Sequence, residues 1–438
     1  MAFQSTETPL SAHAAYIAAA DEIGRHLCAD AIWHEGRCNW IGALPEEGPG
    51  GSLVDAYTTL TSDLYGGTSG VAVFLANLYR FTGDVATRKT ALGAIRQAVA
   101  RSVEKLSASN RGLYGGRPGV ALAAACVGRL LGEDTLLEKA TQLFEGADAE
   151  PGVGREYDLI SGAAGALVGC LMTSEMTGEQ SLLSRAAQLG DELIASAQKT
   201  ESGWSWSSPT NTNSENLTGF SHGAAGVGYA LLELHRATRD VRYRAGAEQA
   251  FMYERGLFDE KAGNWPDLRQ PHPGQSRFSG RVFATFWCHG APGIGLCRLR
   301  GFELLGDSLC RREAELALET TRRSVEADIE VGSANYSICH GLAGNAEVLL
   351  YGEQVLGASA SESGRLANRV AALGISSYPA RGKPWPCGTR GGQSPGLFLG
   401  LAGIGLFYLR LVDPAIPSVL IPRGEAFSRL ALPRIASI

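Results

Sequence analysis

The sequence predicts an all-α fold in which helical hairpins repeat seven times and close into a ring. The first observation is a Gly-x-x-Gly motif that recurs at intervals of roughly 45–70 residues, a spacing typical of repeat architectures, with its first glycine at Gly67, Gly116, Gly162, Gly223, Gly290, Gly341 and Gly400. The second is an apolar stretch of helical type after each motif, such as Val71–Leu78. A helix that is apolar on every side belongs in a protein interior.

The stretch after each apolar helix predicts a second, amphipathic helix. Leu92, Ile95 and Val99 recur at helical spacing and fall on one face of the stretch from Ala91 to Leu106. Several junctions between the two helices carry a glycine followed by an acidic residue, which is typical of a helix C-cap and the next N-terminus, at Gly83-Asp84, Gly132-Glu133, Gly178-Glu179 and Gly306-Asp307. We therefore expect each repeat to contain an inner apolar helix and an outer amphipathic helix.

The ends of the repeat array favour a closed ring over an open solenoid. A solenoid needs polar terminal repeats, yet the last copy, which begins at Leu399, is as apolar as the others. In a ring all seven turns lie at one end, where helix N-termini face a common centre that favours anions and neutral imidazoles. For most copies the glycines also have a purely structural interpretation, as close-packing positions. We expect residues 1–60 to form an N-terminal helical extension and residues 61–438 to form the ring.

Composition excludes several classes of protein. The 438 residues carry a formal net charge of −6 and show no basic cluster, which argues against a nucleic-acid partner. No apolar run approaches the roughly 18 residues of a membrane helix, so we expect no transmembrane segment. The N-terminus lacks the pattern of a secretory signal, so we expect a cytoplasmic location. The nine cysteines then do not indicate a disulfide framework, and most should be small buried side chains, among them Cys126, Cys170, Cys297 and Cys310.

Three of the seven turns place a histidine before the first glycine, at His222, His289 and His340, and Cys288 and Cys339 precede the last two of these. If the ring closes, these residues converge although they are far apart in sequence. Thiolate and imidazole are preferred zinc ligands, and three protein ligands with an open fourth position is the arrangement of catalytic sites. The spacing contains no C-x-x-C pair, however, so each histidine could instead be a hydrogen-bonded residue at a helix start.

Several segments resemble the LanC-like lanthionine cyclases. The resemblance rests on WCHGAPGIGL from Trp287, SICHGLAGNAEVLL from Ser337 and GFSHGAAGVGYALLEL from Gly219. The tail PWPCGTRGGQSPGLFLGLAGIGLFYLRLVDP, followed by PSVL, is similar to the end of class II lanthipeptide synthetases (LanM), in which a dehydratase precedes the cyclase domain. The likeness runs over about residues 64–420, and the stretch NWIG at residues 39–42 resembles a cyclase-domain start.

The resemblance implies an α,α-toroid, a closed double ring of seven inner and seven outer helices, which agrees with the repeat count. It implies a Zn²⁺ ion held by Cys288, Cys339 and His340. It gives His222 the role of acid and base and Asp158, in YDLISGAAG, the role of its partner, although an acidic residue there is also a candidate helix cap. A helix N-terminus and a nearby Zn²⁺ both disfavour an imidazolium, so we expect His222 to be largely neutral at neutral pH.

One position departs from the family pattern. Relatives carry an active-site arginine shortly before the first zinc cysteine, and at the expected offset, four residues before Cys288, this chain has Ala284. Arg281 lies one helical turn further back and is the candidate replacement. His289 stands where many stand-alone cyclases carry an aromatic residue, so it either supplements His222 or lines the pocket.

The implied activity is the addition of peptide cysteine thiols to dehydroalanine or dehydrobutyrine, which forms lanthionine or methyllanthionine thioether rings. The expected partner is a dehydrated precursor peptide with a leader. Because only about sixty residues precede the first repeat, we expect the dehydratase to be a separate protein.

Three alternatives remain open. The same zinc site would serve the addition of glutathione or another thiol to dehydroamino acids. A non-catalytic peptide-binding toroid would hold a structural zinc with four protein ligands, for which Cys387 in PWPCGTRGG is the candidate fourth ligand. An α,α-barrel glycosidase needs a pair of carboxylates, and the repeat turns offer only Asp158.

Overall fold

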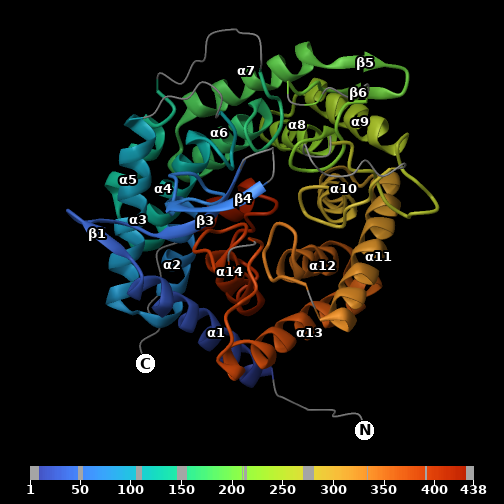
Figure 1. Cartoon of the computed structure of the whole chain (residues 1–438). Helices are drawn as coiled ribbons and strands as arrows, with labels where there is room; N and C mark the ends of the chain where they lie inside the picture. The colour runs from blue at the N-terminus through green and yellow to red at the C-terminus, as the bar shows by residue number, and fades with distance from the viewer. Residues whose placement is uncertain are drawn as a thin grey trace.

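The chain forms a double ring of helices around a common centre (Figure 1). The computed structural model describes residues 9–47, 53–104, 111–145, 155–209, 211, 215–269, 281–332, 334–389 and 392–430. Within these ranges seven inner helices surround the centre: α2 (Thr68–Thr82), α4 (Arg117–Leu131), α6 (Ala163–Thr177), α8 (Ala224–Thr238), α10 (Ala291–Leu305), α12 (Leu342–Leu356) and α14 (Leu401–Val412).

Each inner helix packs against one outer helix. In the described part of the chain, six outer helices follow their inner partner directly, as expected: α3 (Val85–Glu104), α5 (Asp134–Gln142), α7 (Gln180–Ser196), α9 (Val241–Arg255), α11 (Ser308–Val331) and α13 (Ser361–Ser377). The seventh is α1 (Pro9–Ala29), which packs against α14. This arrangement confirms the α,α-toroid.

The first sixty residues differ from the expected helical extension. Helix α1 belongs to the outer ring, so residue 60 does not separate an extension from the toroid. Two β-hairpins follow it, one formed by β1 (Ile32–His34) with β2 (Arg37–Asn39) and one by β3 (Ile41–Glu47) with β4 (Leu53–Thr59). Figure 1 shows the β3–β4 hairpin reaching from the rim toward the middle of the ring. A third hairpin, β5 (Gln198–Thr200) with β6 (Gly203–Ser205), follows α7.

A belt of backbone hydrogen bonds joins the turns that precede the inner helices. Each turn donates at least one N–H to a carbonyl of the next turn around the ring, and the belt closes on itself within the described residues. The seven bonds, 2.9–3.2 Å long, run from Tyr65 to Tyr114, Leu113 to Leu159, Leu159 to Ser221, Ser221 to Cys288, Trp287 to Cys339, Cys339 to Phe398 and Phe398 to Tyr65. The predicted closure is therefore built into the main chain of the turns themselves.

Glycine occupies the two positions of each motif for different structural reasons. The first is the N-cap of its inner helix in all seven described turns. The second leaves no room for a side chain, because a Cβ atom there would meet the carbonyl oxygen six residues earlier. In the α4 turn, a Cβ on Gly119 would lie 1.9 Å from Leu113 O, and in the α10 turn a Cβ on Gly293 would lie 2.0 Å from Trp287 O. The repeated motif is thus a packing requirement of the turn.

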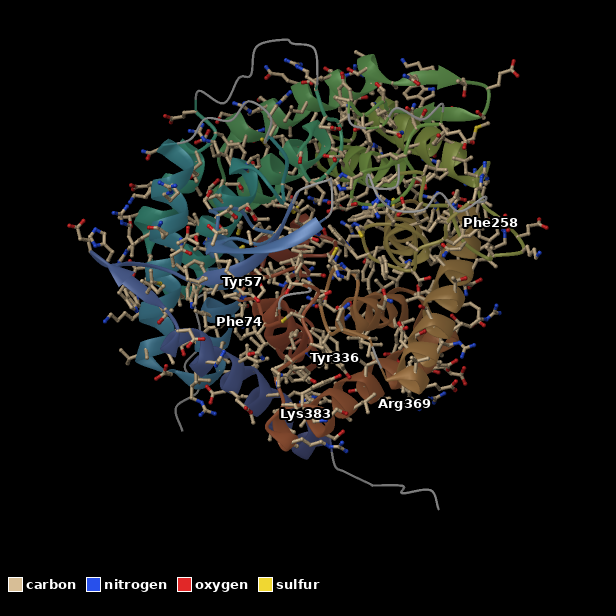
Figure 2. The ribbon with its side chains drawn as sticks, viewed as in Figure 1. Tyr57, Phe74, Phe258, Tyr336, Arg369 and Lys383 are labelled. Carbon is tan, nitrogen blue, oxygen red and sulfur yellow. The ribbon has the colours of Figure 1, made fainter. Side chains whose placement is uncertain are left out.

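Side chains fill the space between the helices (Figure 2). Phe74 and Tyr336 are buried among them, whereas Arg369 and Lys383 lie exposed on the outer face. After α14 the chain, including α15 (Gly424–Ser428), runs inside the ring, where Tyr114 Oη and Trp287 Nε1 donate hydrogen bonds to carbonyls of residues 419 and 420 at 2.8 and 2.9 Å. Short 3₁₀ helices η2 (Gly357–Ala360) and η3 (Pro379–Arg381) flank α13. None of the helices in the described ranges combines the length and apolar character needed to span a membrane.

Candidate active site

The three histidine-bearing turns are neighbours in the ring. The turns of α8 and α10 are joined by the belt bond from Ser221 N–H to Cys288 O, and those of α10 and α12 by the bond from Trp287 N–H to Cys339 O. The Ser221 hydroxyl donates a further hydrogen bond to Cys288 O at 3.0 Å. Because the belt fixes the backbone of each turn against the next, the residues before the glycines are brought to one place.

The two cysteines of these turns form a sulfur pair. A hydrogen bond from the Cys339 thiol, together with the nearby charges of Arg269 and His222, lowers the pKa of Cys288 below that of an ordinary thiol. The bond to Cys288 and burial in turn raise the pKa of Cys339. Tyr65, from the first turn, donates its hydroxyl to the Cys339 sulfur at 3.0 Å. Cys288 is therefore the more acidic member of the pair.

His340 lies beside this pair, with its ring turned toward the loop that follows α13. Its Nε2 donates a hydrogen bond to Gly388 O at 3.1 Å, and the ring of Phe286 stands edge-on to it at 5.6 Å between centroids. Burial lowers the pKa of His340, so its imidazole is neutral near pH 7. Neutral imidazole is the form that binds a metal ion.

Two thiols and a neutral imidazole fit the donor preference of zinc. As the side chains stand, however, no three His, Cys, Asp or Glu residues of the described ranges are arranged so that they could hold a metal ion. Because Nε2–H donates to Gly388 O, Nδ1 is the His340 nitrogen left to bind a metal ion, and a backbone carbonyl is a usual partner for the other nitrogen of a metal-binding histidine. The three ligands implied by the resemblance therefore remain a prediction.

His222 is paired with Asp158, as the resemblance implies. Its Nδ1 lies 2.5 Å from Asp158 Oδ2, and Asp158 is 6% exposed. The other oxygen, Oδ1, accepts the Ser161 N–H at 2.8 Å, so Asp158 also caps its own turn. Burial lowers the pKa of His222, but the hydrogen bond and charge of Asp158 outweigh it and leave that pKa above its ordinary value. The Asp158 carboxylate therefore opposes the effect expected from the helix N-terminus, and the neutrality expected for His222 beside a bound Zn²⁺ stays a prediction.

His289 lies behind His222 and away from solvent. It is 1% exposed, and its ring stacks on that of His222 with 5.7 Å between centroids and 23° between planes. Burial and the charge of Arg269 lower its pKa to about 3, so the ring is neutral. Within the described residues neither ring nitrogen has a hydrogen-bond partner. These properties suit a residue that lines the site and supports His222.

Arg281 does not join the site residues in the structure. Its Nη2 donates to Glu215 Oε1 at 3.1 Å, and both side chains are 44% exposed. The backbone of Ala284, at the expected arginine position, instead accepts a hydrogen bond from Asn264 Nδ2 at 3.0 Å. The arginine whose charge acts on the sulfur pair and on the histidines is Arg269. Sequence reasoning missed it because Arg269 lies in a connecting segment, outside every repeat motif.

Cys387 lies near His340 in the chain path but does not join the sulfur pair. It is buried, its thiol contacts Ser394 O at 3.9 Å, and burial raises its pKa to about 11. Its neighbour Gly388 supplies the carbonyl to which His340 donates. The loop of Cys387 therefore contacts the site through its backbone.

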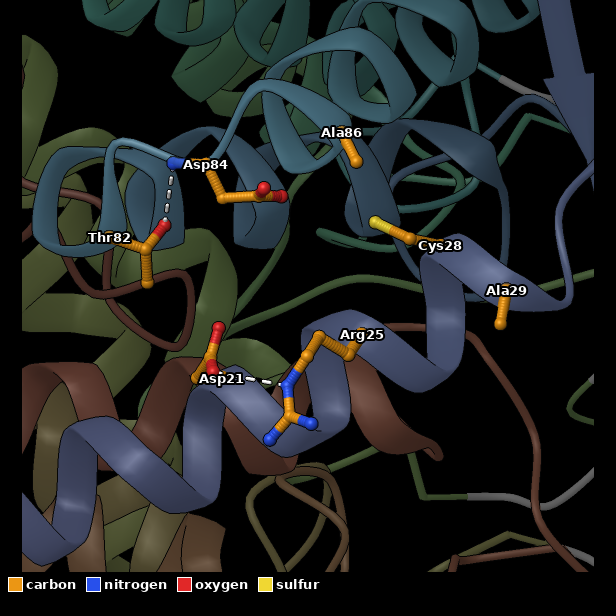
Figure 3. A pocket seen from close by; sticks show the side chains of 7 residues that line it. All are labelled: Asp21, Arg25, Cys28, Ala29, Thr82, Asp84 and Ala86. Atoms are coloured by element: carbon orange, nitrogen blue, oxygen red, sulfur yellow. Dashed lines mark hydrogen bonds and ion pairs between the residues drawn. The ribbon is translucent and has the colours of Figure 1, made fainter.

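A separate hollow of about 580 Å³ opens on the outside of the ring, between α1 and the junction of α2 with α3 (Figure 3). It is lined by Asp21, Arg25, Cys28, Thr82 and Asp84, with Arg25 Nε donating to Asp21 Oδ2 at 3.1 Å. Burial raises the pKa of the Cys28 thiol, so it is a weak nucleophile. None of the candidate catalytic or zinc-binding residues lines this hollow, and the turns at the end of the ring remain the candidate site.

Comparison with known proteins identifies the family. The sequence matches the family described as "Lanthionine synthetase C-like protein" over residues 58–422. It is 27% identical over 218 residues to "Nisin biosynthesis protein NisC" from Lactococcus lactis subsp. lactis, which covers 47% of this chain and 51% of that protein, so the match spans about half of that relative. Among solved structures, "Nisin cyclase" has a similar fold, with a TM-score of 0.60, 18% identity, and coverage of 84% of this chain and 92% of the other. Since the family match spans most of the chain, this protein belongs to the lanthionine synthetase C-like family.

Proposed function

We propose that this protein is a zinc-dependent cyclase that adds cysteine thiols of a dehydrated, leader-bearing precursor peptide to dehydroalanine or dehydrobutyrine residues. The observation that carries the proposal is the convergence of the Cys288–Cys339 sulfur pair with the His222–Asp158 pair at one end of the ring. Family membership and the similarity to a nisin biosynthesis protein support the same chemistry. The products are lanthionine and methyllanthionine rings.

Cys288, Cys339 and His340 would hold the zinc ion. A zinc ion held there would supply Lewis acidity that lowers the pKa of an incoming thiol, so that the thiol could react as a thiolate near neutral pH. The Cys387 thiol faces Ser394 O and not the sulfur pair. This placement favours a site with an open fourth position over a structural site with four protein ligands.

The proton transfers fall to His222. Because its Nδ1–H donates to Asp158, Nε2 is the nitrogen that can accept or return a proton. In the proposed reaction Nε2 takes the thiol proton and a C–S bond forms at the β-carbon of the dehydroamino acid. The C=C electron pair moves toward the carbonyl, giving an enolate, and Nε2–H then protonates the α-carbon. The thiol hydrogen ends on the α-carbon, so no further reagent is consumed.

A synthetic peptide that contains one dehydroalanine and one cysteine tests this function. Ring closure leaves the mass unchanged and hides the thiol, so N-ethylmaleimide treatment followed by mass spectrometry counts the remaining thiols. We expect the protein to accelerate closure over the enzyme-free reaction, with the acceleration lost after chelation of zinc and restored by added Zn²⁺.

Glutathione offered to a dehydroalanine peptide without cysteine tests the main alternative. Acceleration of glutathione addition without acceleration of ring closure would move the assignment to thiol capture. Absence of both reactions, with zinc bound, would favour the non-catalytic peptide-binding toroid and overturn the proposed function.

A further inference from the structure

Arg269 lies beside the proposed active site and has no role in the mechanism above. Its guanidinium is held on the Asp267 carboxylate, with Nε 3.0 Å from Oδ1 and 3.2 Å from Oδ2, and Nη2 2.6 Å from Oδ2. Asp267 is fixed in turn, because its N–H donates to Val282 O at 2.8 Å and its Oδ1 accepts the Arg269 N–H at 3.1 Å. The segment therefore presents a positive charge in a defined position.

Asp267 also places this guanidinium relative to the acid–base pair. Asp267 Oδ1 lies 3.7 Å from His289 Nδ1, and His289 stacks on His222. His222, His289, Asp267 and Arg269 thus follow one another in a row along one wall of the site. The positive charge of Arg269 influences groups across the site, because it also lowers the pKa values of four further side chains: Tyr65, Cys288, Cys339 and His340.

Arg269 has hydrogen-bond donors that no described residue engages. A guanidinium carries five N–H donors, and Asp267 faces only Nε and Nη2. Among the described residues none accepts a hydrogen bond from Nη1, and the side chain is 47% exposed. Arg281, on the far side of the same connection, is engaged by Glu215 and offers a matched comparison.

We propose that Arg269 binds the carbonyl oxygen of the dehydroamino acid and stabilises the enolate formed during thiol addition; this inference rests on the proposed cyclase function. When sulfur bonds to the β-carbon, the C=C electron pair shifts and the carbonyl oxygen gains negative charge. Charge-assisted hydrogen bonds from Nη1 strengthen as that charge grows, so they stabilise the transition state more than the bound substrate. Protonation of the α-carbon by His222 restores the C=O bond and leaves Arg269 unchanged.

The test compares Arg269→Gln with Arg281→Gln in steady-state cyclisation of the dehydroalanine–cysteine peptide by zinc-loaded protein. Removal of one donor that stabilises a developing oxyanion costs on the order of 100-fold in kcat. We expect that loss for Arg269→Gln with little change in KM, and near-normal values for Arg281→Gln. Asp267→Asn should give a smaller loss, because it loosens the guanidinium without removing it. Zinc content and thermal unfolding of each variant establish that the site and fold persist.

Each outcome decides the proposal. Equal kcat in the Arg269→Gln and Arg281→Gln proteins would overturn it, and so would a raised KM with unchanged kcat, which indicates substrate binding alone. If Arg269→Gln fails to fold, Arg269→Lys and Arg281→Lys replace the pair. A lysine cannot hold Asp267 and reach the carbonyl as a guanidinium does, so a lower kcat is expected only for Arg269→Lys, and equal values overturn the proposal. Failure of the unaltered protein to cyclise the peptide overturns the proposed function and this inference with it.

Discussion

The turns that begin α8, α10 and α12 share their backbone with the turns that begin α2, α4 and α6, yet the two groups carry different chemistry. All six use the same belt of hydrogen bonds and the same pair of glycines. They differ at the residue before the first glycine, which is histidine in the first group and Gly66, Gly115 and Ser161 in the second. The same turn geometry therefore places a histidine in one group and leaves a glycine or serine at that position in the other.

This comparison separates two constraints that the motif combines. The glycines are required wherever a turn meets the carbonyl of the residue six positions earlier, whatever the turn does. The position before them holds glycine, serine or histidine in these six turns, so the turn leaves it free to vary. A change at a glycine should therefore affect stability in either group, and a change at the preceding position should affect activity in one group only.

The largest effect is expected from loss of the sulfur pair. Cys288→Ala and Cys339→Ala should each lose zinc and cyclisation, because two sulfurs and one imidazole are needed for a three-ligand site. Elemental analysis of purified protein and the alkylation assay measure both. The matched control is Cys387→Ala, which removes a buried thiol next to the site and should keep zinc. Full zinc occupancy in both sulfur-pair variants, or its loss in Cys387→Ala, contradicts the ligand assignment.

His222→Asn should keep its zinc and lose about 10²–10⁴-fold in cyclisation rate, the usual contribution of a general acid–base group. Asp158→Asn should lose less, since the imidazole remains and only its orientation and charge partner change. The control is His289→Asn, which removes the buried neighbour. If His222→Asn loses its zinc, His222 is a ligand; if it cyclises normally while His289→Asn does not, His289 supplies the proton.

Replacement of the second glycine in the α4 turn, which carries no histidine, should weaken the fold. A Cβ on Gly119 would lie 1.9 Å from Leu113 O, and overpacking of this kind typically costs about 1–3 kcal/mol. We expect Gly119→Ala to lower the free energy of unfolding in urea by that amount, with normal zinc content and normal activity per folded molecule.

The matched control for this change is Gly256→Ala. Its Cβ would lie 3.4 Å from Tyr253 O and 4.0 Å from Met252 O, both ordinary contacts, and its φ of −64° suits any residue. Its stability should stay close to that of the unaltered protein. Equal stability of the two alanine variants would show that the close approach in the turn does not explain the glycine.

The smallest effect concerns pH and the His222–Asp158 pair. The folded pKa of His222 is raised above its ordinary value of about 6.5. The stability from this pair is therefore complete below the unfolded pKa and is lost as pH rises through the folded pKa. The free energy of unfolding in urea, measured on zinc-free protein, should fall more between pH 6 and pH 9 for the unaltered chain than for His222→Asn. Parallel decreases in the two proteins would contradict the raised pKa.

Most of the fold follows from the sequence because its main device is local and repeated. Two glycines mark each turn in the sequence, and an apolar stretch marks each inner helix. The number of repeats and the closure of the ring can therefore be predicted from the motif. The role of α1 could not. Its partner α14 begins at Leu401, and nothing in the sequence of Pro9–Ala29 distinguishes an outer helix of the last repeat from a separate extension.

The residues of the candidate site also fall into those that the sequence predicts and those that it does not. Residues at equivalent positions in the repeat, such as His222 and Cys339, can be located from the motif and the family resemblance. Arg269 lies between repeats, so its position depends on how a connecting segment folds back over the turns. The protonation of His222 depends on a single 2.5 Å contact with Asp158, whose strength no spacing in the sequence conveys.

The hydrogen bond that closes the belt can form only after most of the chain has been translated. The Phe398 N–H donates to Tyr65 O, and the Tyr65 hydroxyl donates to the Cys339 sulfur. Helix α1 packs against α14, the last inner helix, and so has no packing partner of its own until α14 has been synthesised. During translation the first helix emerges from the ribosome long before the last repeat, so the seam at Tyr65 stays open until nearly the whole chain has been made. A nascent or truncated chain thus lacks the assembled site. Under the proposed function, thiol addition would therefore begin only after the last repeat has closed the ring.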